Sequence, residues 1–426
     1  MTKPLIANPY VGPRTFSRNE KNQFFGRDRE ARDLRSLVVS ERLVLFYAQS
    51  GAGKSSLINT RLIPQLVEDE GFVALPIGRV GGELPDGIDD VNNIFAFNLM
   101  LNLEKSGGDP GRFTHMSLPD FLAGLTTSDG EHYVYDETVS LTGASDHNDD
   151  EFVEPPHVLI IDQFEEIVTS HLERWPERTE FFRQLNQAMA DDPLLWVVLT
   201  LREDNVAALR PYARMLPGQM RARFYMQRMK SGAALLAIKE PAQLGNRPFA
   251  DGVAEALLNN LRQIRATDEE AIHFGEFVEP VQLQVVCYQL WQNLKGRDAA
   301  PITEQDLAEL GDVDKALAQF YEQALTHTLQ KTNVSELELR NWFGRKLITE
   351  AETRGTVYQG QTSTAGLDNR VVQSLADQFL LRTETRAGGH WVELVHDRFI
   401  GPILQANQAW NTRQSPLTQA ALAWHR

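Results

Sequence analysis

The chain has 426 residues, of which 42% are hydrophobic, and a formal net charge of −16. This length predicts about two to four folded units, and the hydrophobic content excludes wholesale disorder. The negative charge disfavours a general nucleic-acid or anionic-membrane binder, because both need a positive surface. The N-terminal residues lack an apolar signal core and no apolar run approaches membrane-spanning length, so we expect a cytoplasmic protein with no membrane partner.

The first strong pattern is an apolar run, residues 42–47, followed by the loop Ala48-Gln-Ser-Gly-Ala-Gly-Lys54-Ser55. A strand, a small-residue loop and a helix in this order form a phosphate cradle, where backbone N–H groups converge on a phosphate. The pattern G-x-x-x-x-G-K-[ST] is met except at its first glycine, which is Ala48 here. Lys54 is predicted to neutralise the β- and γ-phosphate oxygens, and the Ser55 hydroxyl to ligate Mg²⁺. The predicted nucleotide-binding residues of this loop are Ser50, Gly51, Ala52, Gly53, Lys54, Ser55 and Ser56.

Further apolar runs predict more strands at residues 71–77, 157–161, 196–200 and 223–226, with an amphipathic helix around residues 181–189. Strands alternating with helices indicate a doubly wound, mainly parallel α/β domain, whose ligand lies beyond the carboxyl ends of the strands.

Residues 80–157 interrupt this alternation and are predicted to be an insertion or irregular acidic region. No Lys or Arg occurs between Phe113 and Glu173, and residues 146–151 are strongly acidic. We expect a solvated loop or a small hairpin around residues 132–135 at the centre of this region.

From about residue 231 the pattern changes to helices only, at residues 233–239, 253–265 and 280–294. The segment 302–399 adds helices at residues 314–329, 336–349 and 370–379. Two apolar stretches then flank the turn-forming residues 386–390, which predicts a β-hairpin. Helices followed by a two-stranded wing are typical of a winged-helix domain.

The run Val158-Leu-Ile-Ile-Asp162-Gln-Phe-Glu165-Glu166 supplies the acidic half of the predicted nucleotide site. An acidic residue at the end of a buried strand next to the phosphate-loop strand holds Mg²⁺, so Asp162 is the predicted metal residue beside Ser55. A carboxylate three residues further on is placed to orient the attacking water. Glu165 is therefore our first choice of catalytic residue, and Glu166 our second.

Arg202 lies at the exit of the strand predicted at 196–200, in the run Leu199-Thr-Leu-Arg202. From its position alone it either points into the same cleft and contacts the γ-phosphate, or is a surface arginine at a strand exit.

Seven segments together carry a family resemblance. Besides the phosphate loop they are Asn8-Pro-Tyr-Val-Gly12, Phe24-Phe-Gly-Arg-Asp-Arg-Glu30, Asp162-Gln-Phe-Glu-Glu166, Leu199-Thr-Leu-Arg-Glu-Asp204, Val278-Glu-Pro-Val-Gln-Leu-Gln284 and Leu394-Val-His-Asp-Arg-Phe-Ile-Gly-Pro-Ile403. The chain resembles a bacterial STAND-class NTPase of the group called novel STAND NTPases, related to the NACHT and NB-ARC switch proteins. The resemblance runs from Asn8 to about Trp410.

The resemblance implies three parts that match the partition seen in the sequence: a P-loop nucleotide-binding domain (1–230), a helical lid (231–300) and a winged helix (301–400). The sequence also predicts a C-terminal helix at 401–426. It implies that Arg202 contacts the γ-phosphate and that His396 contacts the ADP β-phosphate in the resting form. It also implies that the lid proline, Pro280, packs on the base, although the usual glycine two residues earlier is Val278. The residues expected to flank the adenine are Phe25, Gly26 and Arg27.

The leading hypothesis is an ATP-binding and slowly hydrolysing signalling switch, closed with ADP and assembly-competent with ATP and Mg²⁺. Families of this kind include bacterial antiphage defence and regulated-cell-death proteins. The alternative is an AAA+-like ATPase acting on nucleic acid, but its recognition helix at 368–379 carries one Arg against two Asp. A third reading is a nucleotide-binding scaffold without turnover.

The expected partners are copies of the same chain in a homo-oligomer, and a sensor or effector protein in trans. Family members usually carry a repeat sensor after the winged helix and often an effector domain before the NTPase. The chain ends at Arg426 in a predicted helix, so we expect either a truncated form or a minimal module.

Overall fold

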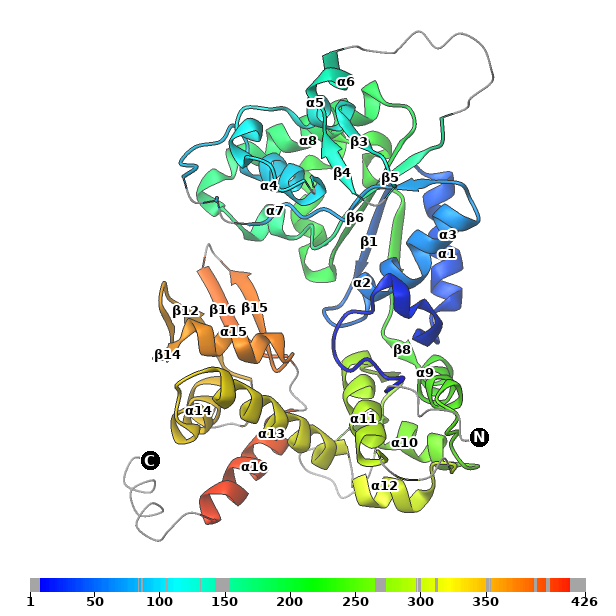
Figure 1. The fold of residues 1–426 in the computed structure, drawn as a ribbon, viewed down its shortest axis with the longest axis vertical. Coiled ribbons are helices and arrows are strands. Elements are labelled where there is room, and N and C mark those ends of the chain that lie inside the picture. The colour runs from blue at the N-terminus through cyan, green and yellow to red at the C-terminus, as the bar shows by residue number, and fades with distance from the viewer. Residues whose placement is uncertain are drawn as a thin grey trace. The chain divides into compact units, whose positions relative to one another are not determined.

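The computed structural model describes residues 8–82, 84–85, 87–104, 106–130, 132–141, 154–264, 273–295, 297, 300–310, 313–349, 352, 354–386, 389–395 and 399–413. The chain divides into two compact units (Figure 1). One unit comprises Thr15–Arg228, and the other joins Met1–Arg14 to Met229–Arg426. Within the described ranges, every helix is too short or too polar to cross a membrane.

The unit Thr15–Arg228 is built on a five-stranded parallel sheet of order β2-β5-β6-β1-β7. The predicted strands at 157–161, 196–200 and 223–226 are confirmed, whereas the strand predicted at 71–77 is reduced to two residues. The continuous apolar runs of these sheet strands fit a parallel sheet that is covered on both faces. The strands are β1 (Leu43–Ala48), β2 (Val73–Ala74), β5 (His157–Ile161), β6 (Leu195–Arg202) and β7 (Arg223–Met226).

The prediction that the Asp162 strand lies next to the phosphate-loop strand is wrong. Strand β6 lies between β1 and β5, pairing Ala48 with Arg202 on one side and Leu199 with Ile161 on the other. The apolar pattern of a strand reports its burial but not its neighbours, because the order is set by how the connecting helices cross over. The inserted strand brings Arg202 directly beside the phosphate loop.

Helices cover both faces of this sheet (Figure 1). On one side lie α1 (Asp28–Ser40) and the helix that follows the phosphate loop. That helix is formed by α2 (Lys54–Leu57), the π-helical turn η2 (Ile58–Leu62) and α3 (Ile63–Glu68). On the other side lie α4 (Ile94–Leu103), α5 (Leu118–Ala123) and α8 (Pro176–Asp191). The residues of β1, β5 and β6 packed with this second group include Leu43, Leu45, Leu159, Ile161, Leu195, Val197, Leu199 and Leu201.

The prediction of an irregular region at residues 80–157 is wrong for the part that α4 and α5 occupy. The α4 sequence, Ile-Phe-Ala-Phe-Asn-Leu-Met-Leu-Asn-Leu, is almost entirely apolar and nearly every residue is buried. A helix buried on all sides lacks the 3.6-residue periodicity that marks an amphipathic helix, so the pattern was not recognisable. The predicted hairpin is confirmed by the antiparallel pair β3 (Leu125–Thr127) and β4 (Tyr133–Tyr135), followed by α6 (Glu137–Leu141). The acidic residues 146–151 lie outside the described residues.

The first unit contains further helices. They are η1 (Arg18–Gln23), η3 (Pro110–Phe113), α7 (Glu166–Thr169), η4 (Leu172–Arg174), η5 (Glu203–Met215) and η6 (Pro217–Met220).

The second unit contains the helices predicted from the apolar periodicity, packed around a single core that includes Leu290, Leu317, Phe343 and Leu375. Residues 414–426 of the predicted C-terminal helix lie outside the described residues. The helices are α9 (Ser231–Leu244), α10 (Val253–Arg262), α11 (Pro280–Asn293), α12 (Glu304–Leu310), α13 (Val313–Lys331), α14 (Glu336–Trp342), η7 (Phe343–Leu347), α15 (Asn369–Asp377) and α16 (Ile400–Thr412).

The prediction of helices only after residue 231 is wrong in detail, because β8 (Met229–Lys230) pairs with β11 (Phe277–Val278) and β9 (Gln263–Ile264) with β10 (His273–Phe274). The predicted hairpin, β15 (Leu381–Arg386) and β16 (Gly389–Leu394), is confirmed. It belongs to a larger five-stranded sheet of order β14-β13-β12-β16-β15. The added strands are β12 (Thr356–Gln359), β13 (Ser363–Thr364) and β14 (Leu367–Asp368).

Candidate functional site

The phosphate loop connects β1 to α2 and has the backbone conformation that its glycines predict. Gly51 and Gly53 have φ angles of 76° and 95°, in the left-handed region that side chains disfavour. Ala48 lies in the extended strand, where alanine is as suitable as glycine. The structure thus explains why the departure at Ala48 leaves the loop intact.

The Arg27 side chain stabilises the phosphate loop. This side chain is 2% exposed, and its guanidinium donates to the Ala52 carbonyl at 3.2 Å and to the Glu30 carboxylate at 2.6 Å. Gly26 just before it has a φ of 83°, and Phe25 is half-buried. The structure therefore gives Arg27 a role in holding the loop, which the sequence pattern did not indicate.

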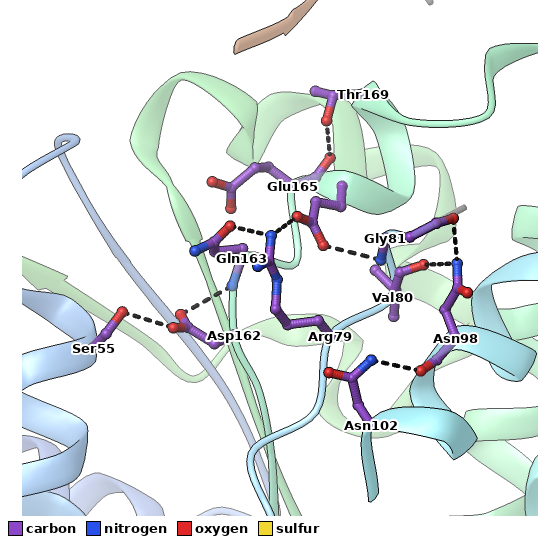
Figure 2. Close-up of polar contacts among 12 residues, drawn as sticks. Ser55, Arg79, Val80, Gly81, Asn98, Asn102, Asp162, Gln163, Glu165 and Thr169 are labelled. Atoms are coloured by element: carbon purple, nitrogen blue, oxygen red, sulfur yellow. Dashed lines mark hydrogen bonds and ion pairs between the residues drawn. The ribbon is translucent and has the colours of Figure 1, made fainter. Parts of the chain in front are cut away.

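Lys54 and Ser55 start the helix and lie beside the acidic segment. The Ser55 hydroxyl donates to Asp162 Oδ2 at 2.7 Å (Figure 2), while the Thr200 hydroxyl donates to the other oxygen of the same carboxylate. Lys54 Nζ lies 3.5 Å from the Ala48 carbonyl oxygen. Burial lowers the pKa of Lys54, and the nearby Glu165 and Asp162 carboxylates oppose this shift. Thr200 was missed in the sequence, although a polar residue inside an apolar strand is a signal.

Ser56 differs from the rest of the predicted loop residues. Its side chain is buried, and its hydroxyl accepts the Phe16 backbone N–H at 3.2 Å. In this structure it therefore binds the N-terminal segment of its own unit.

The residues present fit Mg²⁺. The Ser55 hydroxyl and the Asp162 carboxylate are hard oxygen donors within hydrogen-bond distance of one another. In the described part of the chain, this site included, no group of three or more His, Cys, Asp or Glu side chains is placed to hold a metal. Mg²⁺ commonly takes one or two protein ligands and completes its shell with phosphate and water, which matches this sparse donor set.

The Glu165 carboxylate lies near enough to Lys54 for their charges to interact. Burial raises the pKa of this carboxyl group, and the Lys54 charge opposes the shift. The backbone N–H of Arg202 donates to Glu165 Oε2 at 3.3 Å. The Arg202 guanidinium itself is paired with Asp204 at 2.9 Å.

Glu166 has a different environment. Its carboxylate accepts from the Arg79 guanidinium and from the Gly81 backbone N–H, the latter at 2.9 Å. The two adjacent glutamates thus have different partners: the Glu165 carboxylate lies near the Lys54 charge, and the Glu166 carboxylate is paired with Arg79. Arg79 was also missed, because it lies outside β2, next to the isolated bridge between Gly78 and Ile161, and belongs to no recognisable motif.

Two of the predicted site residues belong to the other unit. Pro280 is the first residue of α11, where its fixed φ suits a helix N-terminus. His396 lies outside the described residues. Their proposed contacts with a nucleotide stay predictions.

The family described as Novel STAND NTPase 1 matches residues 9–426 of the chain. The chain belongs to this family. It is therefore a P-loop NTPase, and the prediction of a nucleotide-hydrolysing enzyme is confirmed at that level. No curated protein matched this novel STAND NTPase significantly.

Solved structures of low sequence identity resemble the protein along most of its length. The Walker-type ATPase paby2304 of Pyrococcus abyssi has 12% identity and a TM-score of 0.39, with 92% of this chain and 98% of that chain covered. The Aeropyrum pernix ORC2 protein in its ADPNP–ADP complexes has 12% identity and a TM-score of 0.40, covering 90% and 94%. The Aeropyrum pernix ORC1 protein in complex with DNA has 14% identity and a TM-score of 0.39, covering 92% and 94%.

Proposed function

We propose that this novel STAND NTPase is a cytoplasmic signalling switch that binds ATP with Mg²⁺ and hydrolyses it slowly. The observation that carries the proposal is the convergence of Lys54, Ser55, Asp162 and Glu165 at the carboxyl ends of β1 and β5. Lys54 binds the β- and γ-phosphates, and Ser55 and Asp162 hold Mg²⁺. When bound, Mg²⁺ neutralises charge on the phosphate oxygens.

In this proposal Glu165 orients the attacking water and accepts its proton. Its burial and its position beside the Lys54 charge favour it over Glu166, whose carboxylate is paired with Arg79. Arg202 contacts the γ-phosphate from the end of β6, which requires its guanidinium to exchange Asp204 for phosphate. Phe25, Gly26 and Pro280 are assigned to the adenine by family resemblance.

The state model also rests on the family. Residues 231–300 act as a helical lid and residues 301–400 as a winged helix, a proposal supported by the helices α9 to α11 and by the hairpin β15–β16 that follows α15. With ADP, His396 holds the closed resting state; with ATP, the protein opens and assembles with further copies or with a partner in trans. A role in antiphage defence or regulated cell death fits this behaviour.

The described helix α15 gives little support to the DNA-binding alternative. Its one arginine, Arg370, is paired with Asp368 at 3.0 Å, and the helix ends at Asp377. A recognition helix needs cations that are available to phosphate.

The proposal is tested by hydrolysis assays on Glu165→Gln and Glu166→Gln. Glu165→Gln is expected to retain Mg·ATP binding and to slow single-turnover hydrolysis by about 10²–10⁴-fold, because it loses the water-activating base. Glu166→Gln should retain most of the activity, since its amide can still accept hydrogen bonds. Normal turnover by Glu165→Gln and loss by Glu166→Gln would show that the catalytic roles are reversed.

A further inference from the structure

The segment that carries Glu165 has an unfavourable backbone conformation. Gln163, directly after Asp162, has a φ of 52°, in the left-handed region that residues other than glycine rarely adopt. Such residues persist only where the surrounding structure fixes them. On the inner side the segment is fixed by Phe164, whose side chain is fully buried and whose N–H donates to the Thr200 carbonyl at 2.7 Å.

On the outer side the segment is bound by the Arg79 side chain. Its guanidinium donates both to Gln163 Oε1 and to the Glu166 carboxylate (Figure 2). Glu166 is also bound by the Gly81 N–H at 2.9 Å. A Cβ atom on Gly81 would lie 2.5 Å from Glu166 Oε2, so a larger residue there would displace the Glu166 carboxylate from its present position.

The segment that bears Arg79 is itself held in place. Gly78 donates to the Ile160 carbonyl and accepts the Asp162 N–H, both at 2.9 Å, which continues the sheet beyond β2. The Asn98 side chain of α4 donates to the carbonyls of Val80 and Gly82 at 3.3 and 3.0 Å (Figure 2). Arg79 therefore projects from a fixed support and binds the residues on both sides of Phe164 and Glu165.

We propose that Arg79 is a positioning residue for the hydrolysis step. By binding Gln163 and Glu166 together, it holds the intervening Glu165 carboxylate beside Lys54 and keeps the Glu166 carboxylate out of the nucleotide site. This inference rests on the proposed role of Glu165 as the base.

The first test compares Arg79→Ala and Arg79→Lys with Arg183→Ala, a control that removes an exposed ion pair with Glu180 on α8. Single-turnover hydrolysis by Arg79→Ala is expected to fall about 10- to 100-fold, the loss that a small misplacement of a catalytic group produces. The affinity for Mg·ATP should change less than about twofold, since no nucleotide contact is removed. Arg79→Lys should recover part of the rate, and Arg183→Ala should match the wild type.

A second test combines Arg79→Ala with Glu165→Gln. Because Arg79 acts through Glu165, its loss should change the residual rate of Glu165→Gln by less than about twofold. An equal fold-loss in both backgrounds, or wild-type turnover by Arg79→Ala, overturns the positioning role. Should Arg79→Ala fail to fold, Arg79→Lys in both backgrounds gives the same comparison. Wild-type turnover by Glu165→Gln alone would instead refute Glu165 as the base, which is a separate failure.

Discussion

Lys54 and Glu165 depend on each other at the level of single residues. Burial disfavours the charge of each, lowering the pKa of Lys54 and raising that of Glu165, while each charge opposes the shift of the other. Both side chains are half-buried, and an arriving phosphate would add a second counter-charge for the lysine. Perturbed groups of this kind are concentrated at functional sites.

Lys54→Ala is expected to weaken ATP binding by about ten- to several-hundred-fold, because it removes the charge that faces the β- and γ-phosphates. Isothermal titration calorimetry measures the affinity. Lys239→Ala, which removes an exposed lysine paired with Glu255, is the control. Equal ATP affinity in Lys54→Ala and the wild type would show that the loop does not bind phosphate.

The pH dependence of hydrolysis follows from the direction of the Glu165 shift. Only the carboxylate form accepts a proton, so the rate should fall as the pH drops through the raised pKa of Glu165. We expect the single-turnover rate at saturating Mg·ATP to fall with a midpoint at a higher pH than the ordinary pKa of a glutamate. This fall should disappear in Glu165→Gln. Its persistence in that variant would assign it to another group.

At the level of elements, the contact between α8 and the sheet depends on Arg42. Its guanidinium donates to the carbonyls of Met189 and Asp192, each at 2.6 Å, and of Leu195 at 3.2 Å. These carbonyls belong to the end of α8, the turn after it and the first residue of β6, and the last carbonyls of a helix lack intrahelical donors. Arg42 thus binds the helix end to the strand that carries Arg202.

Arg42→Ala is expected to lower the free energy of unfolding by about 2–3 kcal/mol, because several carbonyls lose a charged donor. Arg183→Ala, on the exposed face of α8, should change it by less than about 0.5 kcal/mol. Urea denaturation of the two variants makes the comparison. Equal urea midpoints for Arg42→Ala and Arg183→Ala would contradict the capping role of Arg42.

Elements whose sequence patterns are local could be predicted from the sequence alone. The phosphate loop, the strands that became β5, β6 and β7, and the helix α11 all have their expected positions. The position of β6 between β1 and β5 was not predictable, because strand order depends on contacts distant in sequence. Helix α4 was missed because it is apolar on every side.

The same limit applies to the site. Lys54, Ser55 and Asp162 were predictable because each belongs to a short motif that phosphate and metal chemistry requires. Arg79 and Arg27 were not, since each acts through a tertiary contact that only the fold creates. Residues that touch the ligand are therefore easier to find in a sequence than residues that hold them.

At the level of the whole molecule, the switch requires contacts that exist in one nucleotide state only. A contact present in one of two states shifts their balance by its own energy. The proposed His396 contact with ADP is of this type, and a charge-assisted bond shifts the populations by about ten- to a hundredfold.

His396→Ala should therefore reduce the rise in melting temperature caused by saturating ADP and leave the rise caused by Mg·ATP unchanged. Melting curves of the wild type and the variant give both values. If His396 only stabilises its own domain, the variant will melt lower with every ligand and the ADP-induced rise will equal that of the wild type.

Small-angle X-ray scattering of the Glu165→Gln variant tests the switch most directly, because this variant binds ATP and hardly consumes it. The radius of gyration is measured with saturating ADP and with saturating Mg·ATP, after calorimetry has established that both are bound. The proposed switch predicts a larger radius with Mg·ATP, from an opened or assembled state. Superimposable scattering curves from the two nucleotide states would contradict it.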